Sequence, residues 1–221
     1  WAVIALLANT IAQKGLDSIL RVVHFIFAVY LAIIAQFIIQ LIALSVNGIN
    51  PIVYMKKSLA LLILAFTSRS SVGCLPVTIE TLTQKLGVNQ ATASFVAGFG
   101  TTAGMQGCAG IFPSLLIVYV CHLTGTVMDF SMIVMTIIVV TLGSLGIAGI
   151  PGTATMAASV GLSGVGMASS FSLIGPILAI DPLIDMARTM LNVSGSVTNA
   201  LIIDKRLGNL DENIYNEINK N

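Results

Sequence analysis

The stretch IDPLIDMARTMLNVSGSVTNALII, residues 180–203, is apolar enough to cross a membrane, yet it carries polar and charged side chains at regular intervals. Five of them are spaced three or four residues apart: Asp181, Asp185, Arg188, Asn192 and Ser196. Because side chains at this spacing share one face of a helix, the pattern predicts an apolar helix with a single polar face. Charged residues inside membrane helices are rare and face the protein interior or a water-filled pathway. The stretch therefore predicts a polar binding site within a membrane protein.

The composition of the whole chain agrees with this interpretation. Of the 221 residues, 56% are hydrophobic and 9% are charged, and the mean hydropathy is +0.98. Soluble domains carry about 25% charged residues, so the composition predicts an all-α polytopic membrane protein. The net charge of +1 offers no basic surface for phosphate groups, and no nucleic-acid partner is expected. The three cysteines show no CxxC spacing, which argues against a disulfide framework or a zinc site.

The apolar runs divide the chain into three parts. Residues 1–12 are shorter than the roughly 20 residues that a spanning helix needs, and they predict the end of a truncated scaffold helix whose preceding helices lie upstream. Residues 13–203 form a membrane core, and residues 204–221 form a water-facing tail. The core divides into a helix at 18–47, a hairpin at 50–86, a broken helix at 90–123, a second hairpin at 131–165 and a helix at 168–203.

Both predicted hairpins consist of two short apolar arms that meet at a polar or glycine-rich tip. The first tip contains SRSSVG at 68–73, and the second contains GIPG at 149–152. No arm crosses a bilayer alone, so both hairpins are expected to be re-entrant, with tips covered by protein or water. The order of hairpin and long helix occurs twice. Paired interrupted segments of this kind are the sequence feature that best indicates a transporter's binding site.

The distribution of basic residues predicts the orientation. If the spans alternate as described, one side carries Lys56, Lys57, Lys85, Lys205, Arg206 and Lys220. The other side carries Lys14 and Arg21. The positive-inside rule then places the C-terminus of a multi-pass cell-membrane protein in the cytoplasm.

The polar residues of the core fit a small solute with unlike ends. Arg188 can bind a carboxylate through its two-pronged guanidinium, and Asp185 can bind an ammonium group. Asn192 can serve either group. Ser70 and Ser71 stand at the start of a half-helix, where free N–H groups suit an anion.

The second tip and the broken helix suggest a lid and a cation site. Gly149 and Gly152 allow the tip backbone to approach a solute closely, so the tip can act as a lid. Exposed carbonyls and hydroxyls suited to a cation occur in GFGTTAG at 98–104 and GSLGIAG at 143–149.

Several other interpretations remain open from the residues alone. Asp185 and Arg188 can form an internal ion pair, Arg69 can be a counter-charge or a snorkelling residue, and the glycine runs can be helix-packing surfaces. An intramembrane aspartyl protease needs two carboxylates that face each other across a cleft, whereas Asp181 and Asp185 share one helix. An ion channel would normally build its filter from a ring of like groups.

Four motifs occur in order along the chain: SRSSVGCLPVTIET at 68–81, GFGTTAGMQGCAG at 98–110, GSLGIAGIPGTAT at 143–155 and IDPLIDMARTMLNVSGS at 180–196. Together they resemble the dicarboxylate/amino acid:cation symporters, which include the glutamate and aspartate transporters. The resemblance implies the transport core of a glutamate-transporter-like fold, with two re-entrant hairpins, and makes residues 13–203 a transport domain. It further implies alternating access, a homotrimer at full length, no enzymatic activity and no cofactor apart from a transported cation, Na+ or H+.

The resemblance also implies roles for individual residues. Ser70 and Ser71 would bind the α-carboxylate of the substrate, and Asp185 would bind its amino group. Arg188 would bind a distal carboxylate, with Thr189 and Asn192 assisting. A cation site would combine the side chain of Thr102 with carbonyl groups of Ser144, Leu145 and Ile147.

Two departures from the family pattern bear on the substrate. Acidic amino acid transporters have an NMDGT-type stretch where this chain reads GMQGC at 104–108, and an aspartate where it has Ser196. Both changes remove sodium ligands. The stretch at 104–108 resembles that of bacterial transporters of L-cystine. The neutral Gln106 beside glycines would leave room for a larger substrate. L-Cystine import by symport is therefore expected, with aspartate, glutamate, serine or another dicarboxylate as alternative substrates and an ion channel as the less favoured alternative.

Overall fold

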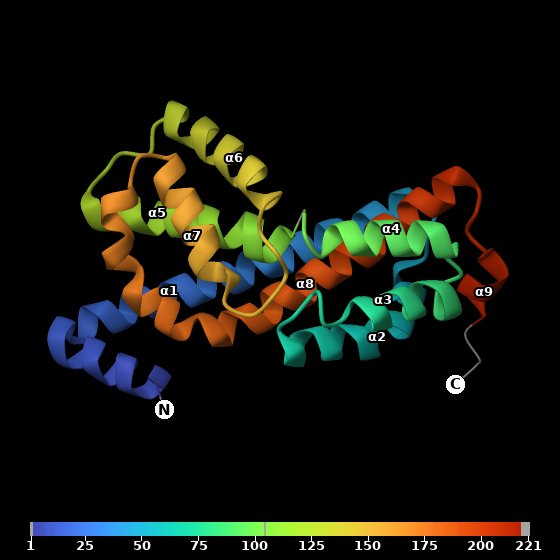
Figure 1. The fold of residues 1–221 in the computed structure, drawn as a ribbon, viewed down its shortest axis with the longest axis horizontal. Helices are drawn as coiled ribbons and strands as arrows, with labels where there is room; N and C mark the ends of the chain where they lie inside the picture. Colours follow the sequence, from blue (N-terminus) through green and yellow to red (C-terminus); the bar gives the residue numbers. More distant parts are fainter. Residues whose placement is uncertain (1, 104, 218–221) are drawn as a thin grey trace.

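The computed structural model describes residues 2–103 and 105–217, and it places side chains from residue 20 onward. The chain is an elongated bundle in which α8 runs through the centre (Figure 1). The helices are α1 (Ala2–Val46), α2 (Pro51–Ser68), α3 (Leu75–Glu80), η1 (Thr81–Lys85), α4 (Gln90–Gly100), η2 (Gln106–Ile111), α5 (Phe112–Thr124), α6 (Phe130–Ser144), α7 (Thr153–Gly164), η3 (Ala168–Ile174), α8 (Gly175–Leu207) and α9 (Glu212–Asn216). The described residues contain no strand, which confirms the all-α prediction.

Four helical stretches are long and apolar enough to cross a membrane, judged by length and composition: Leu20–Val46, Pro51–Ser68, Gln106–Thr124 and Ala168–Leu207. Helix α1 shows why a nonaqueous environment suits them. Its outer face exposes a row of large apolar side chains: Leu20, Val23, Phe27, Leu31, Ile34, Ile38 and Ile42. A contiguous apolar surface of this kind is typical of a membrane or a protein interface. The structure thus confirms several membrane-length apolar helices. One of them, Pro51–Ser68, is the first arm of the first predicted hairpin, and it is longer than the short arm that the sequence led us to expect.

The N-terminal boundary differs from the sequence expectation. Residues 1–12 were expected to belong to a separate helix from residues 18–47, whereas α1 is continuous from Ala2 to Val46. The ribbon of α1 bends sharply near its N-terminal end (Figure 1). Residue 1 of the predicted scaffold helix lies outside the described residues.

Helix α2 and the pair α3–η1 lie antiparallel. The ammonium group of Lys57, near the start of α2, donates a hydrogen bond of 2.8 Å to the carbonyl of Lys85, at the end of η1. Asn50 caps α2 by accepting from the backbone N–H of Ile52 at 2.9 Å, and Pro51 occupies the first turn, where its missing N–H costs nothing. The segment that joins the arms, residues 69–74, is called the first tip below.

Helices α6 and α7 form a second antiparallel pair. A side chain at Gly143 would meet Val160, and a side chain at Gly164 would meet Val139, so glycine lets the two arms touch. Asp129 caps α6 by accepting from the N–H of Met132 at 2.8 Å. The joining segment, residues 145–152, is called the second tip.

The broken helix is interrupted where the glycine-rich motif predicted it. Helix α4 ends at Gly100, an irregular segment follows, and the π-helix η2 leads into α5. Gly107 lies directly against α8, since an added Cβ would stand 2.6 Å from the carbonyl oxygen of Arg188. This close approach requires glycine and brings the backbone of η2 onto the polar face of α8.

Helix α8 joins two apolar clusters. Ile184 and Leu191 pack in a cluster with α5 and α7, whereas Val193 and Val197 pack in a second cluster with α2 and α4. The change occurs at Asn192, which is itself buried. The polar face of α8 is therefore enclosed by packed apolar side chains rather than by water.

The C-terminal segment differs from the expected water-facing tail. Helix α8 continues to Leu207, and the buried carboxylate of Asp204 accepts a hydrogen bond of 2.7 Å from the backbone N–H of Asn89. Further on, the N–H of Asp211 donates to the carbonyl of Gly87 at 2.9 Å. Tyr215 on α9 is buried, and its hydroxyl donates to the carbonyl of Asn50 at 2.9 Å. Burial raises the pKa of Tyr215, which keeps this donor protonated.

Candidate functional site

The two tips meet each other and the broken helix. The N–H of Val72 in the first tip donates to the carbonyl of Gly149 in the second tip at 3.1 Å, and the N–H of Gly149 donates to the carbonyl of Thr101 at 2.9 Å. The hydroxyl of Ser70 lies 3.5 Å from the same Gly149 oxygen. An added Cβ at Gly149 would stand 2.8 Å from both the Cβ of Ser71 and the Thr101 oxygen. Glycine at this position lets three separate segments close on one another.

Arg188 is the centre of the polar face of α8. Its side chain is fully buried, and its Nη2 atom donates to Oδ1 of Asp181 and, at 3.2 Å, to Oδ1 of Asp185. The guanidinium carbon lies 4.1 Å from the centre of the Phe112 ring, a cation–π arrangement. The buried Nε and Nη1 atoms have no hydrogen-bond partner among the described residues. These N–H groups can bind an anionic solute, because buried donors without an acceptor are costly.

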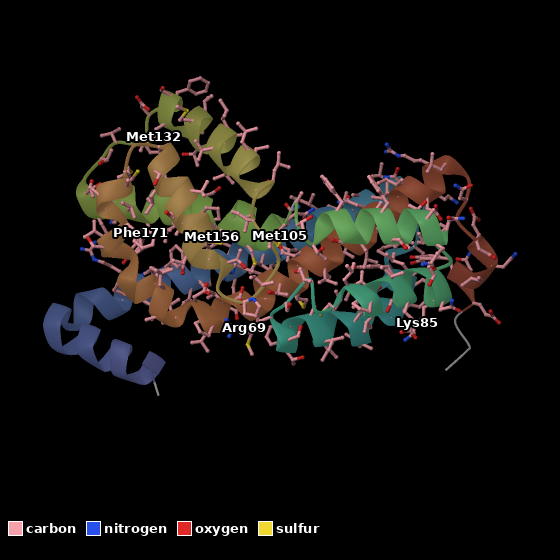
Figure 2. All side chains as sticks on the ribbon, in the orientation of Figure 1. Arg69, Lys85, Met105, Met132, Met156 and Phe171 are labelled. Carbon is pink, nitrogen blue, oxygen red and sulfur yellow. The ribbon has the colours of Figure 1, made fainter. Side chains whose placement is uncertain are left out.

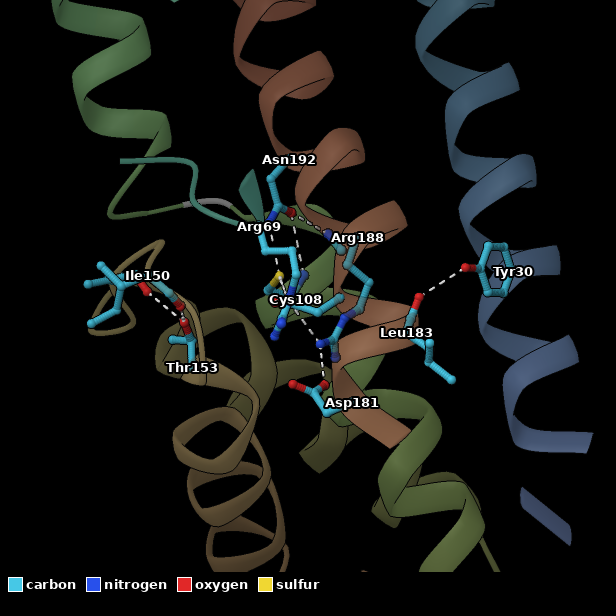
Figure 3. A network of polar contacts seen from close by, with 12 residues as sticks. Tyr30, Arg69, Cys108, Ile150, Thr153, Asp181, Leu183, Arg188 and Asn192 are labelled. Atoms are coloured by element: carbon cyan, nitrogen blue, oxygen red, sulfur yellow. Dashed lines mark hydrogen bonds and ion pairs between the residues drawn. The ribbon is translucent and has the colours of Figure 1, made fainter. Parts of the chain in front are cut away.

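Arg69 neutralises Asp185 from the first tip. Its Nε atom donates to Oδ2 of Asp185 at 3.0 Å, so this carboxylate contacts two guanidinium groups. Figure 3 shows Arg69 and Arg188 close to Cys108 and Asn192. Figure 2 places Arg69 near the middle of the long axis of the molecule. Arg69 has φ 56°, which makes it the one non-glycine residue with a left-handed backbone in the described chain. That conformation costs roughly 1–2 kcal/mol for a residue with a Cβ, and it turns the chain out of α2 toward the site.

Asn192 holds the broken helix. Its Oδ1 atom accepts from the N–H of Gly107 at 2.7 Å and from the N–H of Cys108 at 3.4 Å. Its Nδ2 atom donates to the sulfur of Cys108 at 3.1 Å, and that sulfur lies 3.7 Å from Oδ1 of Asp185. Asn192 was predicted to touch the substrate, and the structure shows that its amide also fixes η2 on α8.

Gln106 belongs to a neutral amide network with α1. Its Oε1 atom accepts from Nε2 of Gln40 at 2.7 Å and from Nε2 of Gln36 at 3.0 Å. Gln40 in turn accepts from the hydroxyl of Ser194, which lies 2.7 Å from the hydroxyl of Tyr54. The network joins four helical segments through neutral donors and acceptors and satisfies buried polar atoms without a charge.

The remaining predicted substrate residues lie at different depths. Ser71 and Thr189 are buried, and Ser70 is half-buried. The Ser70 hydroxyl accepts from the N–H of Gly73 at 3.0 Å, within the first tip. Gly152 is exposed, with φ +88°, at the start of α7.

The predicted cation ligands come from the two segments that meet at Gly149. The hydroxyls of Thr102 and Ser144 each donate to a carbonyl three residues earlier, at 3.2 and 2.7 Å. Leu145 is exposed and Ile147 is buried. Within the part of the chain that the structure describes, no hydrogen bond joins Thr102 to the Ser144 segment. The described residues also contain no group of three His, Cys, Asp or Glu side chains that could hold a metal ion.

Comparison with known families identifies the chain. The model of the sodium:dicarboxylate symporter family matches residues 1–206. The chain belongs to this family. Membership confirms the resemblance read from the four motifs, and the family is one of symporters rather than of enzymes.

Curated members of the symporter family resemble the chain over its whole length. It is 42% identical to the L-cystine uptake protein TcyP of Bacillus cereus over 218 residues, which are 98% of this chain and 47% of the relative. TcyP of Bacillus licheniformis is 41% identical over the same shares, and TcyP of Shouchella clausii is 39% identical over 100% of this chain and 47% of its own length. The chain spans about half the length of the curated relatives that it matches.

Sequence reasoning missed three residues of this candidate site, namely Cys108, Gln36 and Gln40. No role was predicted for Cys108, which lies two residues after Gln106 in the broken-helix motif. Gln36 and Gln40 look like isolated polar residues within an apolar run, and their spacing of four was the available signal. Arg69 was expected to be a counter-charge or a snorkelling residue, and the 3.0 Å contact with Asp185 supports the first of these.

Proposed function

We propose that the chain forms the transport core of a secondary active symporter that imports L-cystine together with a cation. The family is one of symporters, and the relatives at 39–42% identity are named L-cystine uptake proteins. The observation that carries the proposal is the fully buried Arg188, whose Nε and Nη1 groups have no partner among the described residues and whose Nη2 group contacts two aspartates. This arrangement offers both signs of charge to one amino acid, as a zwitterionic solute requires.

Each substrate group has a proposed partner. The free N–H groups of Arg188 bind a carboxylate of cystine, and Ser70 and Ser71 bind the carboxylate at the amino acid end nearer the first tip. Asp185 binds an ammonium group, which displaces the guanidinium of Arg69 and takes over its charge. Thr189 and Asn192 complete the pocket from α8, and Gln106 lines it from the broken helix.

The gates are the two tips. In this proposal α2 with α3–η1, and α6 with α7, are re-entrant hairpins, and Gly149 and Gly152 let the second tip close as a lid over the solute. The antiparallel arms and the Val72–Gly149 contact support this proposal. Residues 13–203 then move as a transport domain during alternating access, against a scaffold to which residues 1–12 belong.

The cation site is proposed at Thr102 together with the carbonyl groups of Ser144, Leu145 and Ile147. The Gly149–Thr101 hydrogen bond supports it, because it brings these two segments together. The transported cation is Na+ or H+. A cation bound here would hold the second tip against the broken helix and thereby couple closure to the gradient.

The location and assembly are proposed from the family resemblance and from the distribution of the basic residues. The full-length protein is proposed to be a homotrimer in the cell membrane, with the C-terminus on the cytoplasmic side. The bilayer is then the environment of the exposed apolar face of α1.

Uptake of radiolabelled L-cystine into proteoliposomes of the full-length protein tests the proposal. Na+ and H+ gradients are imposed separately, and one of them is expected to drive the internal concentration of cystine above its equilibrium value. Competition by unlabelled aspartate, glutamate, serine and cystine distinguishes the substrates, and only cystine is expected to compete at micromolar concentration. Accumulation of aspartate without cystine would favour another substrate of the family, for which the Arg188 guanidinium also suits a second carboxylate. Cystine flux that never exceeds equilibrium would favour a channel.

A further inference from the structure

A groove lies between α1 and α5, at the end of the molecule away from α9. Its volume is about 450 Å³. Ala28, Leu115 and Val118 line its apolar wall. Four residues with polar ends form its rim: Arg21, His24, Tyr119 and His122. Figure 1 shows α1 and α5 side by side here, far from the first tip and from the C-terminal segment.

The rim lies at one boundary of the membrane-length helices. Arg21 and His24 belong to the first turns of the apolar stretch Leu20–Val46, and Tyr119 and His122 belong to the last turns of Gln106–Thr124. The apolar wall extends from this rim toward the middle of both stretches. Arginine and tyrosine at such a boundary reach the headgroup level while their stems stay apolar.

The charge of the rim selects an anion. None of the described residues that line the groove is acidic, whereas Arg21 carries a permanent charge and the two histidines offer ring N–H donors. The hydroxyl of Tyr119 adds a neutral donor. A phosphodiester next to an acyl chain matches both parts of the groove.

We propose that this groove binds one anionic phospholipid, with its phosphate on Arg21 and the two histidines and one acyl chain along Ala28, Leu115 and Val118. Basic pockets between membrane helices recognise lipid headgroups on the cytoplasmic side. In the orientation expected from the basic residues, the Arg21 rim lies on the opposite side, so the proposed lipid belongs to the outer leaflet. A free phosphate would use the rim and leave the apolar wall without an occupant.

The groove is fixed by ring packing that continues to the solute site. The Phe25 ring packs edge-to-face on Tyr119, with centres 5.6 Å apart, and on Phe112, with centres 6.1 Å apart. Phe112 in turn lies beneath Arg188. Ring packing therefore fixes the Tyr119 side of the groove before a lipid binds.

Native mass spectrometry of the full-length protein, reconstituted with phosphatidylglycerol and phosphatidylcholine, tests the proposal. The wild-type protein is expected to retain one phosphatidylglycerol in preference to phosphatidylcholine. Arg21→Gln alone is expected to weaken this retention about fivefold, and addition of His24→Gln and His122→Gln is expected to abolish it. Lys56→Gln removes an exposed charge on α2, outside the groove, and is expected to retain the lipid like wild type.

A second variant separates lipid from phosphate. Ala28→Phe fills the apolar wall without changing the charge, so it is expected to displace phosphatidylglycerol while leaving inorganic phosphate binding unaffected. Retention of phosphatidylglycerol by the triple rim variant at the wild-type level overturns the proposal. Equal loss of lipid in Lys56→Gln also overturns it, because the effect would then be one of net charge. Competition by inorganic phosphate alone, with no effect of Ala28→Phe, would assign the rim to phosphate and overturn the lipid proposal.

Discussion

At the scale of single residues, the site depends on how two guanidinium groups share two carboxylates. Arg188 contacts Asp181 and Asp185, and Arg69 contacts Asp185 from the other side. With two cations and two anions the cluster is neutral without a solute. A buried ion needs such compensation, because removal of one partner leaves an uncompensated charge.

Arg188→Ala is expected to abolish cystine binding and also to lower stability, because it leaves Asp181 without its charge partner. The expected loss is about 3–5 kcal/mol, the range for a broken buried ion pair. Arg188→Lys keeps the charge and is expected to fold, yet to weaken cystine binding at least tenfold, since an ammonium group lacks the planar fork. Calorimetric titration and thermal denaturation of the purified full-length protein measure both effects. Wild-type affinity in Arg188→Lys would refute the proposed carboxylate contact.

Arg69→Gln is expected to raise the affinity for cystine severalfold. In the wild-type protein the substrate ammonium must displace Arg69 from Asp185, and the variant removes this competitor. Equilibrium binding of radiolabelled cystine measures the change. Arg69→Lys, which retains a cation, serves as the matched control and should stay near wild type. A weaker affinity in Arg69→Gln would show that Arg69 binds the substrate itself.

At the scale of elements, the broken helix and the tips show how far the sequence predicts this site. The three-and-four spacing correctly predicted that Asp181, Asp185, Arg188 and Asn192 share a face of α8, because helical periodicity is a local property. The glycine motif likewise predicted the interruption before η2. Spacing along one helix cannot show which partner arrives from a distant segment. The contacts of Arg69, Gln36 and Gln40 became visible only when α8, the first tip and α1 were placed together.

Gly149→Ala is expected to reduce cystine uptake strongly while leaving the fold intact. The added methyl would collide with Ser71 and with the carbonyl of Thr101, so the second tip could not close. Gly98→Ala is the matched control, because an added Cβ there meets nothing within 4 Å. Uptake and thermal stability of both variants are measured in parallel. Equal uptake by both variants would contradict the role of the second tip as a lid.

Gln106→Asp is expected to lower cystine affinity at least tenfold. It shortens the side chain that Gln36 and Gln40 contact, and it places a negative charge in a neutral amide network without an added cation. Binding assays with and without Na+ measure the effect, and Gln106→Asn, which shortens the side chain without the charge, separates the two causes. Unchanged cystine affinity in Gln106→Asp would argue against a position that lines the pocket.

At the scale of the whole molecule, the C-terminal segment stabilises the half of the bundle that holds the first tip. Asp204 binds the backbone at Asn89, Asp211 binds Gly87, and Tyr215 packs beneath Asn50. The polar composition of residues 204–221 predicted a solvated tail, because composition does not report backbone hydrogen bonds. The buried side chains of Asp204 and Tyr215 attach this segment to the bundle.

Asp204→Ala is expected to destabilise the full-length protein by about 1 kcal/mol, since it removes the buried carboxylate that accepts from the partly buried N–H of Asn89. Asp204→Asn retains an acceptor oxygen and should cost less. Thermal denaturation of the purified variants gives the comparison. Equal stability of Asp204→Ala and wild type would mean that water replaces the carboxylate.

The two attachments of the broken helix to α8 have a mechanical consequence. Asn192 accepts a hydrogen bond from the backbone of η2, and Asp204 accepts one from the backbone at the start of α4. The two attachment points on α8 are therefore separated by twelve residues, or about 18 Å of helix. Two hydrogen-bonded attachments at this separation oppose both sliding and rotation of the broken helix relative to α8. Relative motion within the proposed transport core is therefore expected in the tip loops, while α8, α4 and η2 move together as one body.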